Sequence, residues 1–434
     1  MTDNTVARRR ITRDVAATVV VFTAHGAVAG TWFSRMPAVR DHIHADLRTL
    51  GFVLLCFAIG SMIAMPFTGR LIQRFSTRRV CAVGSIGGGL FMSMLPLVSD
   101  TVAFAGVLLL TGVCYGMWNV TINVHGAAIE GRLGRAIMPA FYGALSGGII
   151  LGTAGGALLA AAGVGLAFHF WVIVPPLSAI VIVAIAFWNE WDATGPRTGV
   201  AETDTTVDGD TQPVHMGAAT RTGRRTSTLT LPVLLIGLLA FCSAMAQGAT
   251  SDWLAIHAHD DKGLTEALAA AALTTYAAAE MIGRFTGGRL IDRIGRVWTV
   301  RICGLVAAVG VAATIILPGV AIFLGAALWG FGLSLVGPLT VSAAGDLGGP
   351  DAPRTVATVS TMAWSAFLVG APAMGLLAQR ISLESALWAV VGLAVAVSVL
   401  AGALAPPRKG GPADGPAATP TTTLPGAVSQ PPDP

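Results

Sequence analysis

The chain has 434 residues, of which 54% are hydrophobic and only 12% are charged. Soluble domains carry about a quarter charged residues, so this composition excludes an ordinary soluble protein and predicts one that lies largely within a membrane. The formal net charge of +4 comes mainly from arginines between apolar segments rather than from a basic patch with interleaved aromatic rings, which argues against a nucleic-acid partner.

Apolar segments long enough to span a bilayer recur along the chain. Hydrocarbon about 30 Å thick requires about 20 helical residues, and twelve such segments are predicted. In the first half they are 14–34, 49–72, 80–98, 101–125, 137–162 and 165–189. In the second half they are 229–256, 267–291, 298–317, 319–345, 356–379 and 382–405. The sequence therefore predicts an all-α membrane protein with two six-helix bundles, 14–189 and 229–405.

Three stretches lie outside these spans. Residues 1–13 are expected to form a cytoplasmic tail, 190–228 a flexible linker rich in Thr, Gly and Asp, and 406–434 a disordered tail. A run of three arginines, Arg8 to Arg10, lies shortly before the first apolar segment, but eleven more segments follow, so we expect an uncleaved first span rather than a secretory signal. If both termini are cytoplasmic, most of the arginines lie on the cytoplasmic side of the membrane. Because positive charge is enriched on that side, we expect a plasma-membrane protein with both termini in the cytoplasm.

A hexapeptide at the end of the second span recurs at the end of the eighth. Residues 69–74 read Gly-Arg-Leu-Ile-Gln-Arg and residues 288–293 read Gly-Arg-Leu-Ile-Asp-Arg, so five of the six positions are identical. The match continues at the same spacing at further positions: Ala58 and Ala277, Met62 and Met281, Ile63 and Ile282, and Arg135 and Arg354. A repeat of this length built from apolar helices is typical of transporters.

The second copy resembles the loop motif of the major facilitator superfamily, at Gly288, Asp292, Arg293, Gly295 and Arg296. The first copy departs from that motif, with Gln73 for the acid and Ser76 for the glycine. The resemblance implies two bundles that rock about a shared site, with gating residues Gly69, Arg70, Arg74, Gly288, Asp292 and Arg293. Glycine permits a neighbouring helix to approach closely, and the acid can meet a helix N-terminus or an arginine. The alternative is that these arginines only fix the topology.

The fourth span and its following loop resemble the fucose-permease-like branch of that superfamily, over Gly116–Asn123, His125, Gly126, Glu130, Arg132, Gly134, Arg135, Met138 and Pro139. Further similarity lies at Gly30, Trp32, Arg35 and Pro37, and at Gly248, Ala249, Asp252 and Trp253. The branch usually has a carboxylate at Asn119, a histidine at Tyr142 and a glutamate at Gln247. Each replacement removes a titratable group, so symport of a sugar with a proton does not follow from the resemblance.

Polar side chains within spans are costly in lipid and usually face a cavity. Asn119 and Asn123 share one face of the fourth span with Gly112 and Gly116, and we expect the glycines to open volume and the amides to bind a solute. The alternative is that the amides only bond neighbouring helices. The other expected substrate-binding residues are Gln247, His25 and Trp32. A lone histidine in a membrane is equally well a packing residue, so both interpretations of His25 stay open.

Glu280 lies near the middle of the eighth span, and Arg284 follows one turn later on the same face. One interpretation is a static ion pair. The other is that these two residues couple protons to transport, with Glu280 taking up a proton in alternation with substrate.

The sequence carries no signature of catalysis or of a cofactor. The cysteines stand singly within apolar segments without metal-ligand spacing: Cys56, Cys81, Cys114, Cys242 and Cys303. No phosphate-binding glycine loop and no arrangement of serine, histidine and acid at plausible depth is found. We therefore expect neither an enzyme nor an ATP-driven pump, and no cofactor.

These patterns predict a monomeric secondary transporter of a small organic solute that is uncharged or weakly charged, with protons as the coupling ion. Export of a metabolite or toxic compound is the first hypothesis, and uptake of a sugar-like nutrient is the second. The glycine-rich fifth span is similar to the glycine motif of superfamily exporters, although Thr153 replaces its proline. A sensor on the same fold that transports nothing is a third hypothesis, motivated by the uncharged side chains at Asn119, Tyr142 and Gln247.

Overall fold

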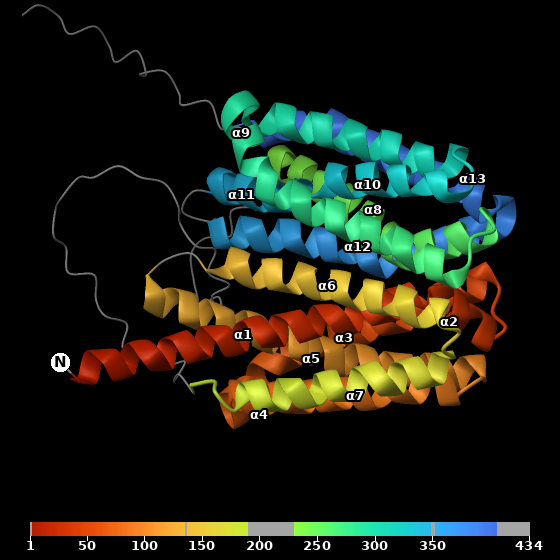
Figure 1. The fold of residues 1–434 in the computed structure, drawn as a ribbon. Helices are drawn as coiled ribbons and strands as arrows, with labels where there is room; N and C mark the ends of the chain where they lie inside the picture. Colours follow the sequence, from red (N-terminus) through yellow and green to blue (C-terminus); the bar gives the residue numbers. More distant parts are fainter. Residues whose placement is uncertain (1, 135–136, 190–229, 349–351, 406–434) are drawn as a thin grey trace, which may run out of the picture.

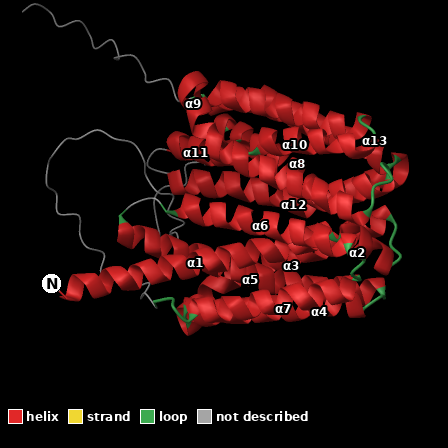
Figure 2. Ribbon diagram, viewed as in Figure 1, coloured by secondary structure: helices red, strands yellow, loops and turns green. Residues whose placement is uncertain are grey.

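The computed structural model describes residues 2–134, 137–189, 230–348 and 352–405. The regular elements of these ranges are helices, and no strand occurs in them (Figure 2). The linker predicted at 190–228 and the tail predicted at 406–434 lie outside the described residues. Residues 2–13, expected as a tail, continue the first helix toward the N-terminus.

The described part of the first half contains seven α-helices. They are α1 (Thr2–Ser34), α2 (Met36–His42), α3 (Leu47–Phe75), α4 (Thr77–Met94), α5 (Thr101–Leu133), α6 (Met138–Ala161) and α7 (Leu166–Ile185). Six of them are long enough to span a membrane, and α2 is a short helix in the loop between the first two spans. The sequence analysis did not predict α2.

The described part of the second half contains α8 (Leu231–Asp260), α9 (Glu266–Ile316), α10 (Ile322–Leu333), α11 (Val336–Gly348), α12 (Ala352–Ile381) and α13 (Leu383–Leu400). Helix α9 has 51 residues, about 77 Å at 1.5 Å per residue, which is twice what one span needs. Its backbone is non-helical at Gly295, so α9 is two spans joined by a tight turn. The predicted tenth span is interrupted, because α10 ends at Leu333 and α11 begins at Val336.

The prediction of twelve spans in two six-helix bundles is confirmed. Figure 1 shows the helices of the first half, red to yellow, grouped below those of the second half, green to blue. Helices α6 and α12 lie where the two groups meet. Since the number of spans is even, α1 begins and α13 ends at the same end of the bundle. We call it the arginine-rich end, because Arg70, Arg74, Arg289 and Arg293 lie there, and we call the other end the α2 end.

The sequence repeat is also a repeat of backbone conformation. Ser76 ends α3 with φ 87° and ψ 152°, and Gly295, the matching residue of the second copy, has φ 76° and ψ 163°. Gly163 and Ser382 form a second matching pair at the same spacing, with φ of 70° and 96°. In each pair one copy keeps the glycine that this backbone region favours, and the other copy carries a strained serine.

Helix α1 packs against α6 backbone to backbone. A Cβ atom added to Gly148 would lie 2.0 Å from the carbonyl oxygen of Thr23, and one added to Gly152 would lie 2.2 Å from that of Ala27. Gly26 and Gly30 make the reciprocal contacts on α6. Small residues at these positions allow two membrane helices to approach closely, so α1 and α6 are fixed relative to each other within the first half.

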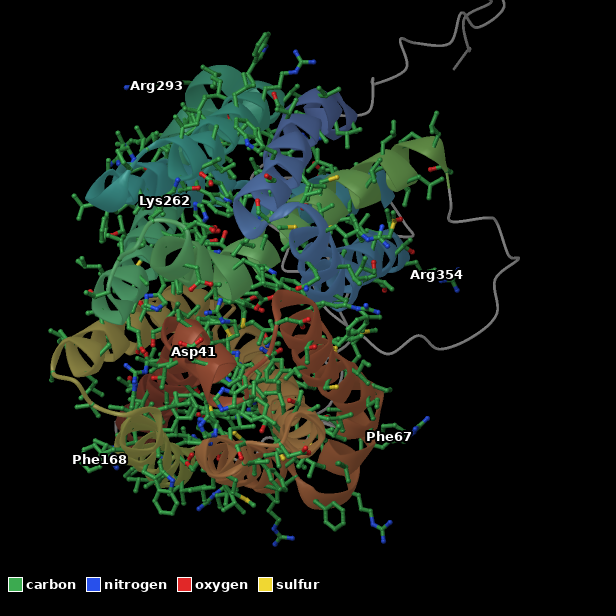
Figure 3. The ribbon with its side chains drawn as sticks, turned by 90° about the vertical axis from the view of Figure 1, so that its right-hand side faces the viewer. Asp41, Phe67, Phe168, Lys262, Arg293 and Arg354 are labelled. Carbon is green, nitrogen blue, oxygen red and sulfur yellow. The ribbon has the colours of Figure 1, made fainter. Side chains whose placement is uncertain are left out.

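The two halves are in close contact at the α2 end. A Cβ atom added to Gly51 of α3 would lie 2.7 Å from the carbonyl oxygen of Ala371 in α12, and one added to Gly375 would lie 2.5 Å from that of Leu47. Figure 3 looks along the helices from this end and shows the two groups of helices, with Asp41 of α2 near the place where they meet. The glycines therefore seat α3 of one half directly against α12 of the other.

Candidate functional site

Four polar side chains of the first half form a chain of hydrogen bonds within the spans. The amide of Asn119 on α5 lies 3.3 Å from Nε2 of His25 on α1. One turn later, the side-chain amide of Asn123 donates to the backbone carbonyl oxygen of Asn119 at 2.8 Å. The hydroxyl of Tyr142 on α6 then donates to Oδ1 of Asn123 at 2.7 Å. The predicted pair of amides thus joins α1, α5 and α6, and the side chain of Tyr142 is 45% exposed at the outer end of this chain.

His25 is enclosed by aromatic rings and is only 1% exposed. The ring of Tyr115 stacks on it with centroids 4.0 Å apart, and the ring of Trp118 meets it edge-on at 4.8 Å. A side chain buried in this way orients the amide of Asn119 and does not itself offer a surface to a solute. Trp32 does not belong to this group of side chains. Its ring faces α7 instead, with its centroid 6.4 Å from that of Phe170.

The expectation that Gly112 and Gly116 open volume beside the amides is wrong. A Cβ atom on Gly112 would lie 2.2 Å from the carbonyl oxygen of Phe57, and one on Gly116 would lie 2.8 Å from that of Ser61. Both glycines therefore seat α5 against α3 instead of lining a cavity. The amides point away from this contact, toward α1 and α6.

The second half contributes three polar side chains from α8 and α9. Arg284 donates to Oε1 of Glu280 at 2.7 Å, and Gln247 donates to the same oxygen at 3.3 Å. The structure therefore places Gln247, predicted separately, beside the predicted pair of Glu280 and Arg284. A carboxylate within a membrane span requires such partners, because an unpaired charge there is costly.

Ser146 connects the two groups. Arg284 donates from Nη1 to the hydroxyl oxygen of Ser146 at 2.7 Å, and this hydroxyl donates to the carbonyl oxygen of Tyr142 one turn earlier on α6. Tyr142 thus meets Asn123 through its hydroxyl and Ser146 through its backbone carbonyl, so a series of polar contacts links His25 in the first half to Gln247 in the second. We call this series the central network. Sequence analysis missed Ser146, although it lies on the helical face of Tyr142 in the glycine-rich fifth span.

Ion pairs also join the two halves at the α2 end. Arg40 of α2 binds Asp260 at the end of α8, and Nη1 of Arg35 lies 3.2 Å from Oε2 of Glu266 at the start of α9. Burial lowers the pKa of Arg40, but its hydrogen bonds to Asp260 and Asp41 outweigh this and hold the pKa above its ordinary value. Sequence analysis did not predict these contacts between the halves.

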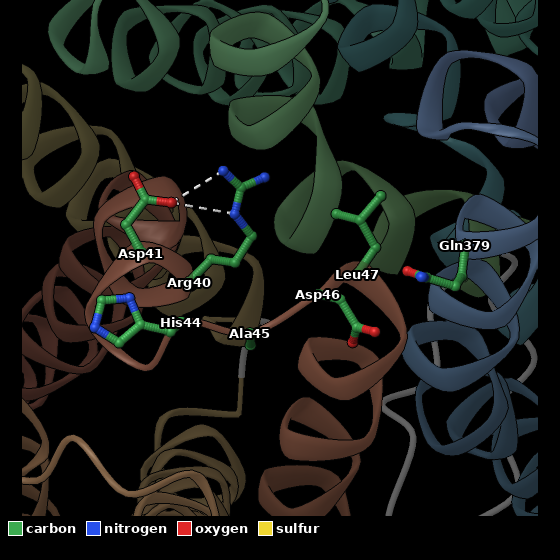
Figure 4. Close-up of a pocket in the computed structure, with 7 residues that line it drawn as sticks. All are labelled: Arg40, Asp41, His44, Ala45, Asp46, Leu47 and Gln379. Carbon is green, nitrogen blue, oxygen red and sulfur yellow. Dashed lines mark hydrogen bonds and ion pairs between the residues drawn. The ribbon is translucent and has the colours of Figure 1, made fainter.

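A pocket of about 500 Å³ lies beside these ion pairs, lined by Arg40, Asp41, His44, Ala45, Asp46, Leu47 and Gln379 (Figure 4). Gln379 comes from α12 and lies across the pocket from α2, so both halves contribute to it. Asp46 caps the N-terminus of α3, and the hydrogen bonds that it accepts from Thr49 lower its pKa. The pocket marks the place where the two halves meet at this surface.

The predicted gating residues at the arginine-rich end make few contacts. A Cβ atom on Gly69 or Gly288 would meet nothing within 4 Å, so the close helix contact expected there is not formed in this structure. Arg70 and Arg74 lie over the rings of Phe67 and Phe75, at 5.9 and 5.4 Å. Asp292 and Arg293 are exposed. These residues lack contacts because the two halves meet at the opposite end, where the ion pairs of Arg40 and Arg35 and the glycine contacts of α3 and α12 join them.

A buried acid that the sequence analysis did not select lies near the arginine-rich end. Oδ1 of Asp14 on α1 is 2.7 Å from Nε2 of His125 on α5, and the side-chain amide of Asn189 donates to Oδ2 at 3.1 Å. The ring of Trp188 stacks on His125 with centroids 3.9 Å apart. Asp14 is 1% exposed and His125 4%. The cluster fixes the residues after α7 to α1 and α5.

Two matched halves of membrane-spanning helices, joined by a polar network within the spans, are the architecture of a membrane transporter. The family model of the Major Facilitator Superfamily matches residues 17–273 and 236–431. The chain therefore belongs to that superfamily and is a multi-pass membrane transporter of its type, not an enzyme. The narrower resemblance to the fucose-permease-like branch stays a prediction.

Curated relatives cover nearly the whole chain. The chain is 31% identical over 387 residues to the uncharacterized transporter y4wD of Sinorhizobium fredii, covering 88% of this chain and 95% of the relative. It is 29% identical over 395 residues to an uncharacterized MFS-type transporter of Yersinia pestis, covering 91% and 96%. It is also 24% identical over 392 residues to the membrane protein MosC of Rhizobium meliloti, covering 88% of each.

Solved structures share the fold. The nucleoside transporter NupG matches with a TM-score of 0.63 at 14% identity, covering 91% of this chain and 98% of that one. A bacterial homologue of the human lysosomal transporter Spinster, in an inward-facing and unoccupied conformation, matches with a TM-score of 0.64 at 12% identity, covering 91% and 96%. At these identities the likeness is one of fold.

Proposed function

We propose that the protein is a proton-linked secondary transporter of a small, uncharged or weakly charged organic solute. The observation that carries the proposal is the central network, in which amide and hydroxyl groups of the first half lie next to an acid, an amide and an arginine of the second, and the arginine bonds to the hydroxyl of Ser146 across the boundary. Such groups can bind hydroxyl, carbonyl or amide functions of a solute without compensating a net charge. A solute that replaces these bonds changes the contact between the halves.

Within this proposal the residues have different roles. Asn119, Asn123, Tyr142 and Gln247 bind the solute, and His25 orients Asn119. Glu280 takes up the coupling proton, and Arg284 transmits the change to the first half through Ser146. A protonated Glu280 no longer pairs with Arg284 as an ion, which frees the guanidinium to leave Ser146 or to meet the solute.

The accompanying membrane topology is also a proposal. We infer a plasma-membrane protein with both termini cytoplasmic, because arginine is concentrated at the end where α1 begins. The α2 end is then external, and the described structure is the state that is closed toward the outside. A green fluorescent protein fused to the C-terminus should fluoresce, and an alkaline phosphatase fusion there should be inactive. The reverse result would place the termini outside.

The direct test is transport in proteoliposomes that contain a pH-sensitive dye. Neutral sugars, polyols, nucleosides and aromatic amides are added in turn, and internal pH is followed with and without an imposed gradient. Wild-type protein should show proton flux that depends on one of these solutes. Glu280→Gln should abolish uptake driven by the gradient while sparing solute binding, whereas Glu384→Gln, an acid at the α2 end, should leave both intact. Unchanged gradient dependence in Glu280→Gln would refute the coupling role.

The proposal favours export of a metabolite or toxic compound, and uptake of a sugar-like nutrient is the alternative. Everted and right-side-out vesicles from the same cells distinguish them, because an exporter accumulates its solute in everted vesicles when the interior is acidic. A sensor on the same fold predicts saturable solute binding with no flux in either orientation.

A further inference from the structure

A groove of about 360 Å³ runs along the first half between α1, α6 and α7. Its lining is almost entirely apolar, and several of its residues are large hydrophobic side chains that remain exposed. Leu151 is 64% exposed, Ile180 47% and Val20 40%. On helices that span a membrane, exposed side chains of this kind face lipid rather than water. The groove is therefore open to the bilayer and separate from the central network.

The length of the groove corresponds to one leaflet. On α1 its lining extends over 19–31, and the twelve steps of 1.5 Å from Val19 to Thr31 cover about 18 Å of helix. Half of a hydrocarbon core about 30 Å thick is about 15 Å. Thr31 lies one turn before the end of α1 at Ser34, so the groove begins near the membrane surface at the α2 end and reaches the middle of the bilayer.

The surface end of the groove contains two polar side chains without partners. His169 lies in the first turn of α7 and is 0% exposed, and neither of its ring nitrogens has a hydrogen-bond partner. The hydroxyl of Thr31, 1% exposed, also has none. Buried polar groups in native proteins are nearly always bonded, so an unpaired histidine and an unpaired threonine that line the same groove point to a missing ligand.

The two ends of the groove thus differ in polarity in the same way as a phospholipid. The N–H of His169 and the O–H of Thr31 are donors at the depth where acyl ester carbonyls lie, and the remaining lining accepts an alkyl chain. We propose that this groove binds one phospholipid, with an ester carbonyl bonded to His169 and Thr31 and one acyl chain lying along α1 toward Val19 and Ile180. This inference is independent of the solute and of proton coupling.

A bound lipid would affect function because α1 lines the groove and also carries His25 of the central network. The backbones of α1 and α6 are in direct contact beside the groove, and these same helices carry His25, Tyr142 and Ser146 of the central network. Rocking of the two bundles requires the first half to move as a unit. A bound acyl chain fills the space between α7 and the α1–α6 pair and so stabilises that unit.

Gly155 allows a clean test. It lines the groove, and a Cβ atom built on it meets nothing within 4 Å, so Gly155→Leu places a side chain in the groove without moving the backbone. Gly106 of α5 is an exposed glycine with equally open surroundings and serves as the control through Gly106→Leu. His169→Phe keeps a ring of similar size and removes both nitrogens. It reports on the polar end even if Gly155→Leu does not fold.

The experiment is native mass spectrometry of protein purified in mild detergent, followed by crosslinking with a phospholipid that carries a diazirine in its acyl chain. Wild type and Gly106→Leu should retain one phospholipid and crosslink mainly to α1, α6 and α7. Gly155→Leu should lower the lipid-bound fraction at least fivefold, and His169→Phe should lower it measurably. Equal retention in all four proteins, or crosslinks spread evenly over the exposed helices, would show only ordinary annular lipid and overturn the proposal.

Discussion

Arg284 of α9 donates a hydrogen bond to Ser146 of α6, across the boundary between the two halves, at 2.7 Å. The same guanidinium holds Glu280 at 2.7 Å. One side chain therefore contacts both the acid proposed to take up a proton and the opposite half. If Arg284 moves toward a more negative partner, its hydrogen bond to Ser146 weakens, and with it the contact between the halves. Protonation of Glu280 removes the charge that holds Arg284 and therefore also changes this contact.

Ser146→Ala should weaken the closed arrangement of the α2 end. A hydrogen bond to a charged group contributes about 1.5–3 kcal/mol, so the equilibrium between closed and open states should shift about tenfold or more. Spin labels at Ala45 and Gln379, on opposite sides of the pocket at the α2 end, should report a larger population of long distances.

The control for this experiment is Ser93→Ala. The Ser93 hydroxyl bonds within its own helix, to Gly89 at 2.7 Å, and is equally buried in the first half. It should leave the distance distribution unchanged. If Ser146→Ala gives the wild-type distribution as well, the bond to Arg284 does not contribute to the equilibrium.

The strained serine at the end of α3 leads to a prediction about stability. Ser76 has φ 87° and ψ 152°, a region that is populated essentially only by glycine and costs about 1–3 kcal/mol for other residues. Ser76→Gly should raise the melting temperature in detergent, and Gly295→Ser at the matching position should lower it. If the melting temperatures of both variants moved in the same direction, the backbone strain at residue 76 would not be what determines the change in stability.

Much of this architecture follows from the sequence because it depends on local pattern. Apolar segments near the length of a bilayer place the spans, and the recurrence of Gly-Arg-Leu-Ile at 69–72 and 288–291 places the boundary between related halves. The same recurrence aligns Ser76 with Gly295, and the similar φ and ψ angles of these two residues confirm the alignment. The helix break between Leu333 and Val336 was missed because hydropathy continues across it, although Pro338 follows directly and a proline clashes with the carbonyl of the residue four positions earlier, here Ser334.

The site was only partly predictable, for a physical reason. Asn119, Gln247 and Glu280 stand out because polar side chains are costly in lipid. Helical periodicity pairs Glu280 with Arg284 on its own helix, but it does not reveal partners on other helices, such as His25 for Asn119. Ser146 and Arg40 act through contacts between distant segments, and a serine or a loop arginine is common enough to attract no notice. The roles of Gly112 and Gly116 were misjudged because a glycine that admits a neighbouring helix looks, in sequence, like one that opens a cavity.

The buried cluster around Asp14 should be essential for stability rather than for transport. Asp14→Ala leaves His125 and Asn189 without their partner inside the bundle, which should destabilise the fold by about 1–3 kcal/mol. Asp14→Asn keeps an oxygen and an amide of similar shape and should cost less. Thermal unfolding in detergent measures both. A greater loss for Asp14→Asn than for Asp14→Ala would contradict this interpretation and point to a requirement for the charge itself.

The contact of Arg40 with Asp260 should stabilise the closed α2 end modestly and in a salt-dependent manner. The side chains of Arg40 and Asp260 are 18% and 28% exposed, so water screens the pair and its contribution should be about 0.2–1 kcal/mol. Asp260→Asn should therefore increase the open population in the distance measurement between Ala45 and Gln379, and 1 M salt should reduce the difference from wild type.

Asp41→Asn is the matched control for that pair. Asp41 also binds Arg40, at 3.0 Å, but both residues lie on α2 in the same half. Removing the Asp41 charge leaves the ion pair of Arg40 and Asp260 in place. This variant should therefore keep the wild-type distribution of distances between Ala45 and Gln379. It should not favour opening, because Arg40 then binds Asp260 alone. If Asp41→Asn opens the α2 end as much as Asp260→Asn does, the effect reflects the local charge around Arg40 rather than a bond that holds the two halves together.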